Sequence, residues 1–359
     1  MPLDSYVSLG RSGLRVSPFT LGAMTFGEDN GWGASPEESD SMISEYLYRG
    51  GNSIDTANMY TNGHSEKIIG DYLASRPGLR DRTVLGTKFF GNLWAGDPNG
   101  GGAGRKAIVA QAEESLRRLR TDYIDLYWLH NWDRTAPIAE TMRALDDLVT
   151  AGKIRYIGIS DLPAWKVTEA QLVAEFRGWT PAIALQVEYS LLARTIEGEY
   201  LDMAQHLGLG VMPWSPLRNG FLSGKFSRRN TGPVDGQRST MTGQPTNAEH
   251  DVIDVLRGVA AEAGVTPAAA ALSWVQHRPG VTSTLLGARH LDQLRANLDA
   301  VDVHLTDDQT RLLDKVSAPQ LGFPAQYAAF TRDIGFAGAT VDGVPSQVPH
   351  LLAKSPTRY

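Results

Sequence analysis

The sequence predicts an α/β protein that folds as a single (β/α)8 barrel, the TIM-barrel architecture, because strand-like and helix-like segments alternate along most of the chain. Eight short runs are apolar and rich in β-branched residues, as expected for parallel strands that are buried on both faces. Amphipathic helical patterns separate these runs, and eight strands each followed by a helix favour a closed barrel over an open doubly wound sheet. The length of 359 residues suits one such barrel with additions at its ends.

The eight predicted barrel strands are defined by these apolar runs. In chain order they are Phe19–Leu21, Asn52–Asp55, Thr83–Thr87, Tyr123–Leu129, Ile154–Ser160, Ile183–Val187, Gly210–Pro213 and Thr282–Leu286.

The helices between them are recognised by apolar residues that recur every three or four positions. This spacing is clearest from Ile108 to Leu119 and from Ile138 to Val149. Gly152 is well placed to end the second of these helices in a left-handed turn. Ser65 is predicted to cap the helix that follows the second strand.

The barrel is expected to occupy residues 1–317, with a β-hairpin over residues 1–17 in front of the first strand. The glycine-rich segment 89–105 predicts a long irregular loop, and the polar segment 227–247 predicts a lid or binding loop. Residues 318–359 are expected to form an irregular tail, which contains Phe323, Tyr327, Phe330 and Phe336. Such a tail either covers the substrate cleft or packs against the outside of the barrel, and the sequence leaves both possibilities open.

Composition excludes several classes of protein. Hydrophobic residues make up 42% and charged residues 21%, which excludes a fibrous or wholly disordered chain. The net charge of −6 has the wrong sign for a dedicated nucleic-acid binder. The absence of cysteine excludes disulfides and thiolate metal sites, and no pair of histidines has metal-ligand spacing, so no metal is expected. Without an 18-residue apolar span or a signal-like start, we expect no membrane contact and a cytoplasmic location.

Polar residues stand where the predicted strands end, which is the face of such a barrel that carries the active site. The strand ends carry Asp55, Lys88, His130, Ser160 with Asp161, Gln186, and Trp214 with Ser215, and Tyr60 follows Asp55 by five positions. Each of these residues alone has an ordinary structural explanation, such as a solvated lysine or a core histidine. Their convergence on one barrel mouth indicates a site.

The chemistry of this set is that of a proton donor. A tyrosine hydroxyl with a pKa near 10 is a weak acid at neutral pH. A neighbouring lysine ammonium favours the phenolate and lowers that pKa, while an aspartate keeps the lysine charged and oriented. A neutral imidazole hydrogen-bonds a carbonyl oxygen and turns it towards the acid. The set therefore protonates an oxygen on which negative charge develops, and no nucleophile is evident.

With these residues, the chain resembles the aldo-keto reductase superfamily, and in particular bacterial members similar to the branch of the potassium-channel β-subunits. The segments that carry the resemblance extend in the right order over about residues 5–305, with a strand end in each. They are Asn52–Tyr60, Gly86–Lys88, Asp125–His130, Gly158–Ser160, Gln186, Pro213–Leu217 and Leu285–Asn297.

The resemblance implies an NADPH-dependent oxidoreductase that reduces an aldehyde or ketone to an alcohol, reversibly, by hydride transfer. It implies that Tyr60 is the general acid, that Lys88 and Asp55 tune it, and that His130 positions the carbonyl of a small-molecule substrate.

The resemblance also implies a nicotinamide cofactor that lies across the barrel mouth without a Rossmann domain. Trp214 is expected to stack on the nicotinamide ring, and Ser160, Asp161 and Gln186 to hold its carboxamide. The family usually has asparagine or arginine where Asp161 stands, which puts that contact in doubt. The remaining expected cofactor contacts are Met24, Asp55, Ser215, Pro216, Leu217, Asn219, Lys225, Arg238 and Gly287.

The adenosine end of the cofactor is expected at Arg289, Gln293 and Asn297, which are four residues apart on one helical stripe. A guanidinium suits a ribose 2′-phosphate, which favours NADPH over NADH. The nearest acid, Asp292, is expected to point away from this stripe, so it does not favour NADH.

Large aromatic residues in the predicted mouth loops indicate a roomy, apolar substrate cleft. Together with His130, the expected substrate contacts are Trp32, Phe89, Trp94 and Trp132.

Two other functions are compatible with parts of this pattern. One is an NADPH-binding regulatory subunit, but the potassium-channel β-subunits lack a histidine at the position of His130. The other is a Schiff-base lyase with Lys88 as nucleophile, which leaves Tyr60 and Trp214 unexplained. The sequence does not reveal the substrate, the preferred direction or the oligomeric state.

Overall fold

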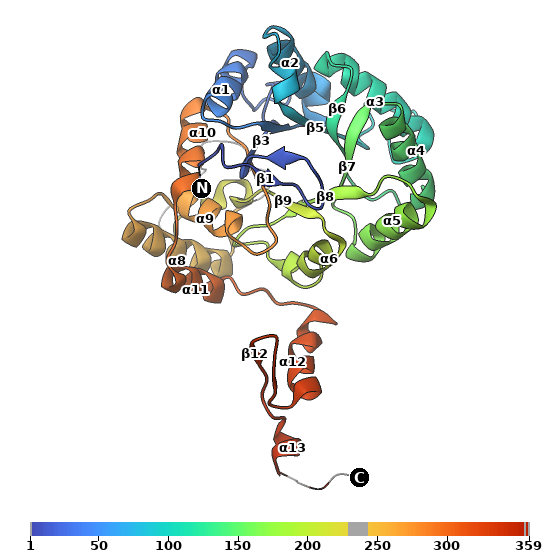
Figure 1. The fold of residues 1–359 in the computed structure, drawn as a ribbon. Helices are drawn as coiled ribbons and strands as arrows, with labels where there is room; N and C mark the ends of the chain where they lie inside the picture. Colours follow the sequence, from blue (N-terminus) through green and yellow to red (C-terminus); the bar gives the residue numbers. More distant parts are fainter. Residues whose placement is uncertain (1, 229–242, 355–356, 358–359) are drawn as a thin grey trace.

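The computed structural model describes residues 2–228, 243–354 and 357, and its centre is an eight-stranded parallel barrel surrounded by helices (Figure 1). The barrel strands agree with the eight predicted ones, with small shifts at their ends. They are β3 Phe19–Gly22, β4 Ser53–Asp55, β5 Val84–Phe89, β6 Ile124–Leu129, β7 Ile154–Ser160, β8 Ala182–Glu188, β9 Gly210–Trp214 and β10 Thr284–Leu286.

Every neighbouring pair in the order β10-β3-β4-β5-β6-β7-β8-β9 is parallel. The last gap is closed between β9 and β10 by a bridge from Val211 to Val281 and by the Thr282 amide, which donates to the Val211 carbonyl at 2.8 Å. This closure confirms the (β/α)8 prediction.

Helices cover the outside of the barrel (Figure 1). They are α1 Pro36–Tyr48, α2 His64–Ala74, α3 Arg105–Leu119, α4 Ile138–Thr150, α5 Ala164–Arg177, α6 Tyr200–Leu207, α8 Asn247–Ala263, α9 Pro267–Gln276, α10 Leu291–Leu298 and α11 Asp307–Val316. Several begin at side-chain caps: Ser35 accepts from the Glu38 amide at 3.2 Å, and Thr246 and Glu249 form a capping box. No single helix of the described residues is long and apolar enough to cross a membrane; α8 and α9 pass that test only together, bent by 96°.

One cap was predicted wrongly. Helix α2 begins at His64 after Gly63, which has a left-handed φ of 92°, so Ser65 lies inside the first turn. The Ser65 hydroxyl instead donates to the Ala23 carbonyl at 2.7 Å and contacts the Thr56 hydroxyl at 2.8 Å. The Ser65 side chain, which we expected to cap the helix, therefore forms tertiary hydrogen bonds instead.

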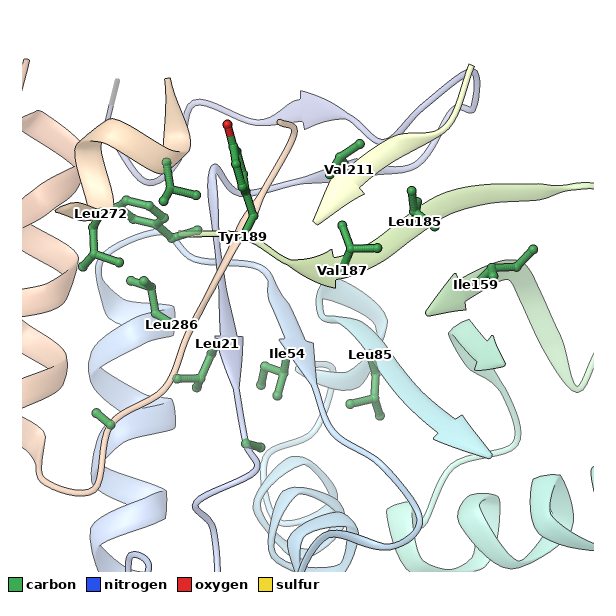
Figure 2. Packing of buried hydrophobic residues seen from close by; sticks show 14 of the residues in the cluster. Leu21, Ile54, Leu85, Ile159, Leu185, Val187, Tyr189, Val211, Leu272 and Leu286 are labelled. Atoms are coloured by element: carbon green, nitrogen blue, oxygen red, sulfur yellow. The ribbon is translucent and has the colours of Figure 1, made fainter. Parts of the chain in front are cut away.

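The main hydrophobic core lies between the barrel and its helices, where outward-facing strand residues such as Leu21, Ile54, Leu85 and Leu185 pack (Figure 2). A second cluster fills one end of the barrel interior. The hairpin of β1 Val7–Ser8 and β2 Arg15–Val16 contributes Leu9 and Val16 to it, and its largest member is the fully buried Trp128. Gly158 makes room for this indole, because a Cβ there would lie 2.2 Å from a Trp128 ring atom.

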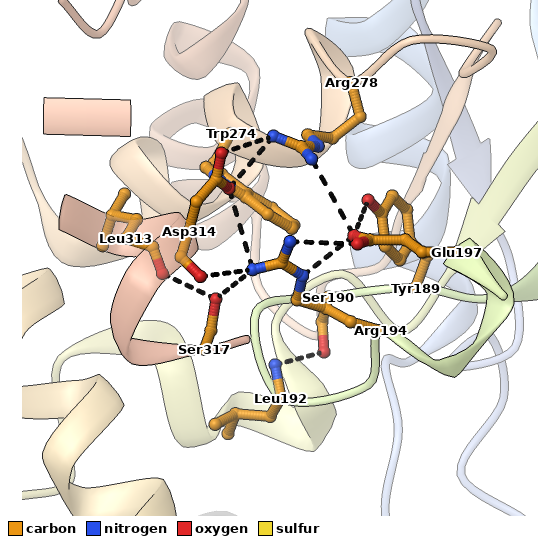
Figure 3. A network of polar contacts seen from close by, with 10 residues as sticks. All are labelled: Tyr189, Ser190, Leu192, Arg194, Glu197, Trp274, Arg278, Leu313, Asp314 and Ser317. Carbon is orange, nitrogen blue, oxygen red and sulfur yellow. Dashed lines mark hydrogen bonds and ion pairs between the residues drawn. The ribbon is translucent and has the colours of Figure 1, made fainter. Parts of the chain in front are cut away.

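A network of charged side chains holds the segment after β8 against α9 and α11 (Figure 3). Arg194 donates two hydrogen bonds to the Glu197 carboxylate, at 2.8 and 3.0 Å, and one to the Ser317 hydroxyl at 2.7 Å. Arg278 donates to both oxygens of Asp314 at 3.0 Å. Most of these groups are partly buried, so the network fixes the end of β8 relative to two distant helices.

The C-terminal segment contains α12 Ala325–Phe336, a two-stranded hairpin of β11 Thr340–Val341 and β12 Val344–Pro345, and α13 His350–Lys354. It extends outward beyond α6 and α11 and does not lie over the barrel axis in Figure 1. Phe323, Tyr327, Phe330 and Phe336 are all exposed. The division at residue 317 and a role for the tail in covering the cleft remain predictions.

Candidate active site

Strand alternation brings the predicted polar residues together at the carboxyl ends of the strands. Successive side chains of a strand point to opposite faces, so the residue two positions along shares a face. Lys88 is paired in register with Trp128, Ser160 with Gln186, and Glu188 with Trp214. These polar residues thus lie inside the barrel, next to the second hydrophobic cluster, which contains Trp128.

Lys88 and Asp55 form a buried ion pair at the centre of this group. Both side chains are almost completely inaccessible to solvent, and the Lys88 ammonium also donates to the Thr56 carbonyl at 2.9 Å. The Gln186 amide donates to the other Asp55 oxygen at 3.3 Å. Burial raises the pKa of Asp55 although the Lys88 charge opposes this rise. Burial works to lower the pKa of Lys88, but the charges of Asp55 and Tyr60 and the hydrogen bonds to them together raise that pKa, so the ammonium is retained.

Tyr60 lies beside this pair on a short 3-10 turn, Tyr60–Gly63. The turn is made by left-handed Thr61 and Asn62, with φ of 46° and 55°. The Thr61 hydroxyl anchors it by donating to the Phe26 carbonyl at 2.8 Å and accepting from the Ser65 amide at 3.1 Å. These bonds hold the phenol ring with its centroid 5.0 Å from the Lys88 ammonium.

The net effect on the Tyr60 acidity differs from the sequence-based expectation. Lys88 does lower the pKa of Tyr60, but desolvation by burial is larger and raises it overall. The free hydroxyl therefore keeps its proton at neutral pH. The lysine charge stabilises the phenolate once the proton has left.

His130 follows β6 and stands edge-on to Tyr60, with ring centroids 5.9 Å apart at an interplanar angle of 81°. Burial, with the Lys88 charge, lowers the pKa of His130 to about 3, so its imidazole is neutral at physiological pH. Its Nδ1 is buried and has no hydrogen-bonding partner within the described part of the chain. A neutral ring beside the phenol hydroxyl suits a hydrogen bond to a substrate oxygen.

Asp161 and Trp214 meet across the end of β8. Asp161 has a left-handed φ of 55°, and its Oδ1 accepts from the Trp214 indole at 3.0 Å. The Ser160 hydroxyl donates to Oδ2 at 3.2 Å. Solvent in the open mouth reaches this carboxyl group, but protein surrounds it on its other sides, and this desolvation raises the pKa of Asp161 to about 6.

Sequence reasoning missed an ion pair at the same mouth, between Glu188 and Arg218. Glu188 is two positions beyond Gln186 on β8, so strand alternation already placed it on the inward face. Arg218 follows β9 within a turn that we interpreted only as part of the pyrophosphate site. Its partner depends on tertiary structure, and no local pattern revealed it.

The turn after β9 has an unusual backbone. Ser215, Arg218 and Asn219 have φ of 53°, 47° and 53°, and Gly220 has 98°. The Asn219 amide donates to the Ser215 hydroxyl at 3.3 Å, which folds the turn onto itself. The Arg218 amide also donates to the Ser215 carbonyl at 2.8 Å, and the Gly220 amide donates to the Leu217 carbonyl at 2.9 Å, so hydrogen bonds within the turn hold its backbone.

Other expected cofactor contacts lie near this turn or at the barrel rim. Pro216 is buried, Leu217 is partly buried, and Lys225 is exposed beyond the turn. Met24, after β3, is 38% exposed. Arg238 falls outside the described residues.

Of the predicted stripe, Gln293 and Asn297 lie on α10, and Arg289 lies in the loop that precedes this helix. The Gln293 side chain accepts from the Arg289 backbone amide at 3.2 Å, and Asn297 donates to the Gly287 carbonyl at 3.4 Å. Within the described residues, the Arg289 guanidinium has no ionic partner. Asp292 is 95% exposed and pairs with Arg295 at 3.5 Å, as expected for a side chain outside the stripe.

The aromatic residues of the predicted cleft divide into two groups. Trp32 and Trp132 are partly buried, Trp94 is 45% exposed, and Trp132 packs edge-on against Trp165 at 5.7 Å. Phe89 does not reach the mouth. It is fully buried in the outer core, 4.9 Å from the Tyr127 ring, because it follows the inward-facing Lys88 on the same strand.

Comparisons with known proteins indicate the family of this chain. The sequence profile of the Aldo/keto reductase family matches residues 18–318. The chain is similar to an uncharacterized oxidoreductase, YrpG, of Bacillus subtilis, at 36% identity over 87% of this chain and 95% of that protein. It is 33% identical to a putative aryl-alcohol dehydrogenase, AAD14, of Saccharomyces cerevisiae, over 87% of this chain and 86% of that protein. It is also 33% identical to a norsolorinic acid reductase of Aspergillus flavus, over 88% of this chain and 81% of that protein.

Proposed function

Because the chain belongs to the aldo/keto reductase family, we propose that it reduces an aldehyde or ketone to an alcohol with NADPH, reversibly, and that Tyr60 is the general acid. The single observation that carries this proposal is the contact of Tyr60 with a buried Lys88–Asp55 pair and a neutral His130. These groups supply a proton, a charge and a hydrogen bond at one point.

The residues present suit a nicotinamide dinucleotide. Among the described residues, the mouth contains an Asp161 carboxylate without a cationic partner, a turn with four left-handed residues after β9, and Arg289 without an ionic partner. Ser160, Gln186 and Trp214 would hold the nicotinamide end, and Arg289 would bind the 2′-phosphate by charge-assisted hydrogen bonds. The bound dinucleotide would supply the hydride.

The protein side of the reaction is proton delivery. The His130 imidazole orients the substrate carbonyl, and the Tyr60 hydroxyl donates its proton to the carbonyl oxygen as negative charge develops there. Lys88 stabilises the remaining phenolate. A unit charge 5.0 Å away contributes about 3 kcal/mol at an effective dielectric constant of about 20. Asp55 keeps the ammonium in place.

Substitution of the proposed acid tests this function. Tyr60→Phe is expected to lower the rate of carbonyl reduction by about 10²–10⁴ and to leave NADPH binding nearly intact. A panel of aldehydes, ketones and sugars, followed by NADPH consumption, identifies a substrate, and fluorescence titration measures binding. Tyr48→Phe is the matched control, because Tyr48 is 89% exposed on α1. If Tyr60→Phe keeps more than about a tenth of wild-type turnover in a step limited by chemistry, Tyr60 is not the acid.

A further inference from the structure

The carboxylates at the barrel mouth are not equivalent. Asp55 is paired with Lys88, and Glu188 is paired with Arg218. Asp161 accepts hydrogen bonds only from neutral groups, the Trp214 indole at 3.0 Å and the Ser160 hydroxyl at 3.2 Å, and no cation pairs with it among the described residues. Within the part of the chain that the structure describes, Asp161 is therefore a mouth carboxylate without an ionic partner.

The backbone fixes this charge in place. Asp161 follows β7 directly, its left-handed φ of 55° turns the side chain across the end of β8, and its amide donates to the Gln186 carbonyl at 3.3 Å. Its Oδ1 reaches the last residue of β9. The carboxylate thus lies beside the indole that the proposed function assigns to the nicotinamide ring.

We propose that Asp161 is the counter-ion of the oxidised nicotinamide ring and makes the protein prefer NADP+ over NADPH more strongly than an amide at this position would. This inference rests on the proposed function. The oxidised ring carries a positive charge and the reduced ring carries none, so a fixed carboxylate distinguishes the two forms by charge alone.

The effect of Asp161 on the reaction follows from the charge that develops on the nicotinamide ring. One hydrogen with two electrons moves from the dihydronicotinamide to the carbonyl carbon, and the Tyr60 proton moves to the carbonyl oxygen, so the carbonyl is reduced and the cofactor is oxidised. Positive charge grows on the ring as the hydride leaves. Asp161 stabilises that charge, which favours reduction on the enzyme and slows release of NADP+.

The preference is expected to depend on pH through Asp161. Desolvation by the protein around it is the largest cause of the raised pKa of Asp161, which is about 6; Lys88 lowers this pKa and Glu188 raises it. Tyr60 and Tyr200 also feel its charge, and Arg218 partly offsets that of Glu188. His130, with a pKa of about 3, stays neutral in this range. Above pH 7 the carboxylate is charged, and below pH 6 it becomes protonated and loses its preference.

The test measures cofactor binding, not turnover. Dissociation constants of NADP+ and NADPH are determined by tryptophan fluorescence and calorimetry at pH 8 for the wild type and for Asp161→Asn, which keeps an acceptor for the Trp214 indole. The ratio Kd(NADPH)/Kd(NADP+) is expected to fall about tenfold in the variant, equivalent to about 1.4 kcal/mol. The control is Asp122→Asn, which removes an exposed carboxylate just before β6, at the opposite end of the barrel, and should leave the ratio unchanged.

The same titrations at pH 5.5 should move the wild-type ratio part of the way towards that of Asp161→Asn, because the carboxyl group is then partly protonated. Protonation of the 2′-phosphate, whose second pKa is about 6, affects both cofactors alike and cancels in the ratio. If both cofactors bind and the variant changes the ratio less than twofold at pH 8, the role of Asp161 is refuted while the proposed function stands. If the wild type binds neither cofactor, the proposed function fails and this inference fails with it.

Discussion

Replacement of Lys88 by methionine should destabilise the fold through the carboxylate that it leaves behind. Methionine is nearly isosteric with the lysine stem, so the substitution removes the ammonium without a large cavity. Lys88 is 0% exposed and Asp55 is 2% exposed, so Asp55 would be a buried charge without its partner. Breaking such a pair costs about 3–5 kcal/mol in the free energy of unfolding.

The sign of the pH dependence follows from Asp55. Burial already raises its pKa in the folded protein, and the loss of Lys88 raises it further. A carboxyl group whose folded-state pKa is above its unfolded value near 3.9 contributes stability at low pH and loses it as the pH rises through the folded value. The Lys88→Met variant should therefore be weakest above neutral pH and recover part of the loss on acidification.

Urea denaturation at pH 8 and pH 5, for the wild type, Lys88→Met, Asp55→Asn and the double variant, measures these terms. The double variant has no charge at these two buried positions and should be more stable at pH 8 than Lys88→Met alone. Our interpretation of the pair is refuted if Lys88→Met costs less than about 1 kcal/mol at pH 8, or if the double variant regains nothing.

Three further predictions address the mechanism, the cofactor and the barrel interior. Lys88 should never become covalently attached to a substrate, so borohydride treatment with aldehydes and mass spectrometry should find no adduct on it; an adduct would favour a Schiff-base lyase. Arg289→Ala should weaken NADPH binding by roughly 10- to 150-fold and NADH binding by less than about threefold, as measured by fluorescence titration; equal weakening of both would indicate a disturbed helix instead of a lost phosphate contact. Gly158→Ala should lower the free energy of unfolding by about 1–3 kcal/mol, because its Cβ would lie 2.2 Å from the Trp128 ring. Gly258→Ala, on the open face of α8, is the control and should not lower it. An unchanged urea midpoint for Gly158→Ala would show that the barrel interior has room for a methyl group.

The residues around the proposed acid could be predicted from the sequence because their positions depend on local order. Asp55, Lys88 and His130 each stand at the end of an apolar strand, and the carboxyl ends of parallel strands meet at one face. The same reasoning, applied fully, would have placed Glu188 inside with Gln186 and Phe89 outside next to Lys88. Those two positions were missed although strand alternation determines them.

By itself, the sequence determined the barrel, its eight strands and the residues at their ends, since hydrophobic periodicity is a local property that each segment carries along its own length. Only the tertiary structure decided which charges are paired and how far each is buried. The Arg218 partner of Glu188, the Ala23 carbonyl that accepts from Ser65, and the net rise in the pKa of Tyr60 all depend on groups distant in the chain. Electrostatic energies depend on the distances between charges and on how far each charge is removed from solvent, and the local sequence determines neither quantity.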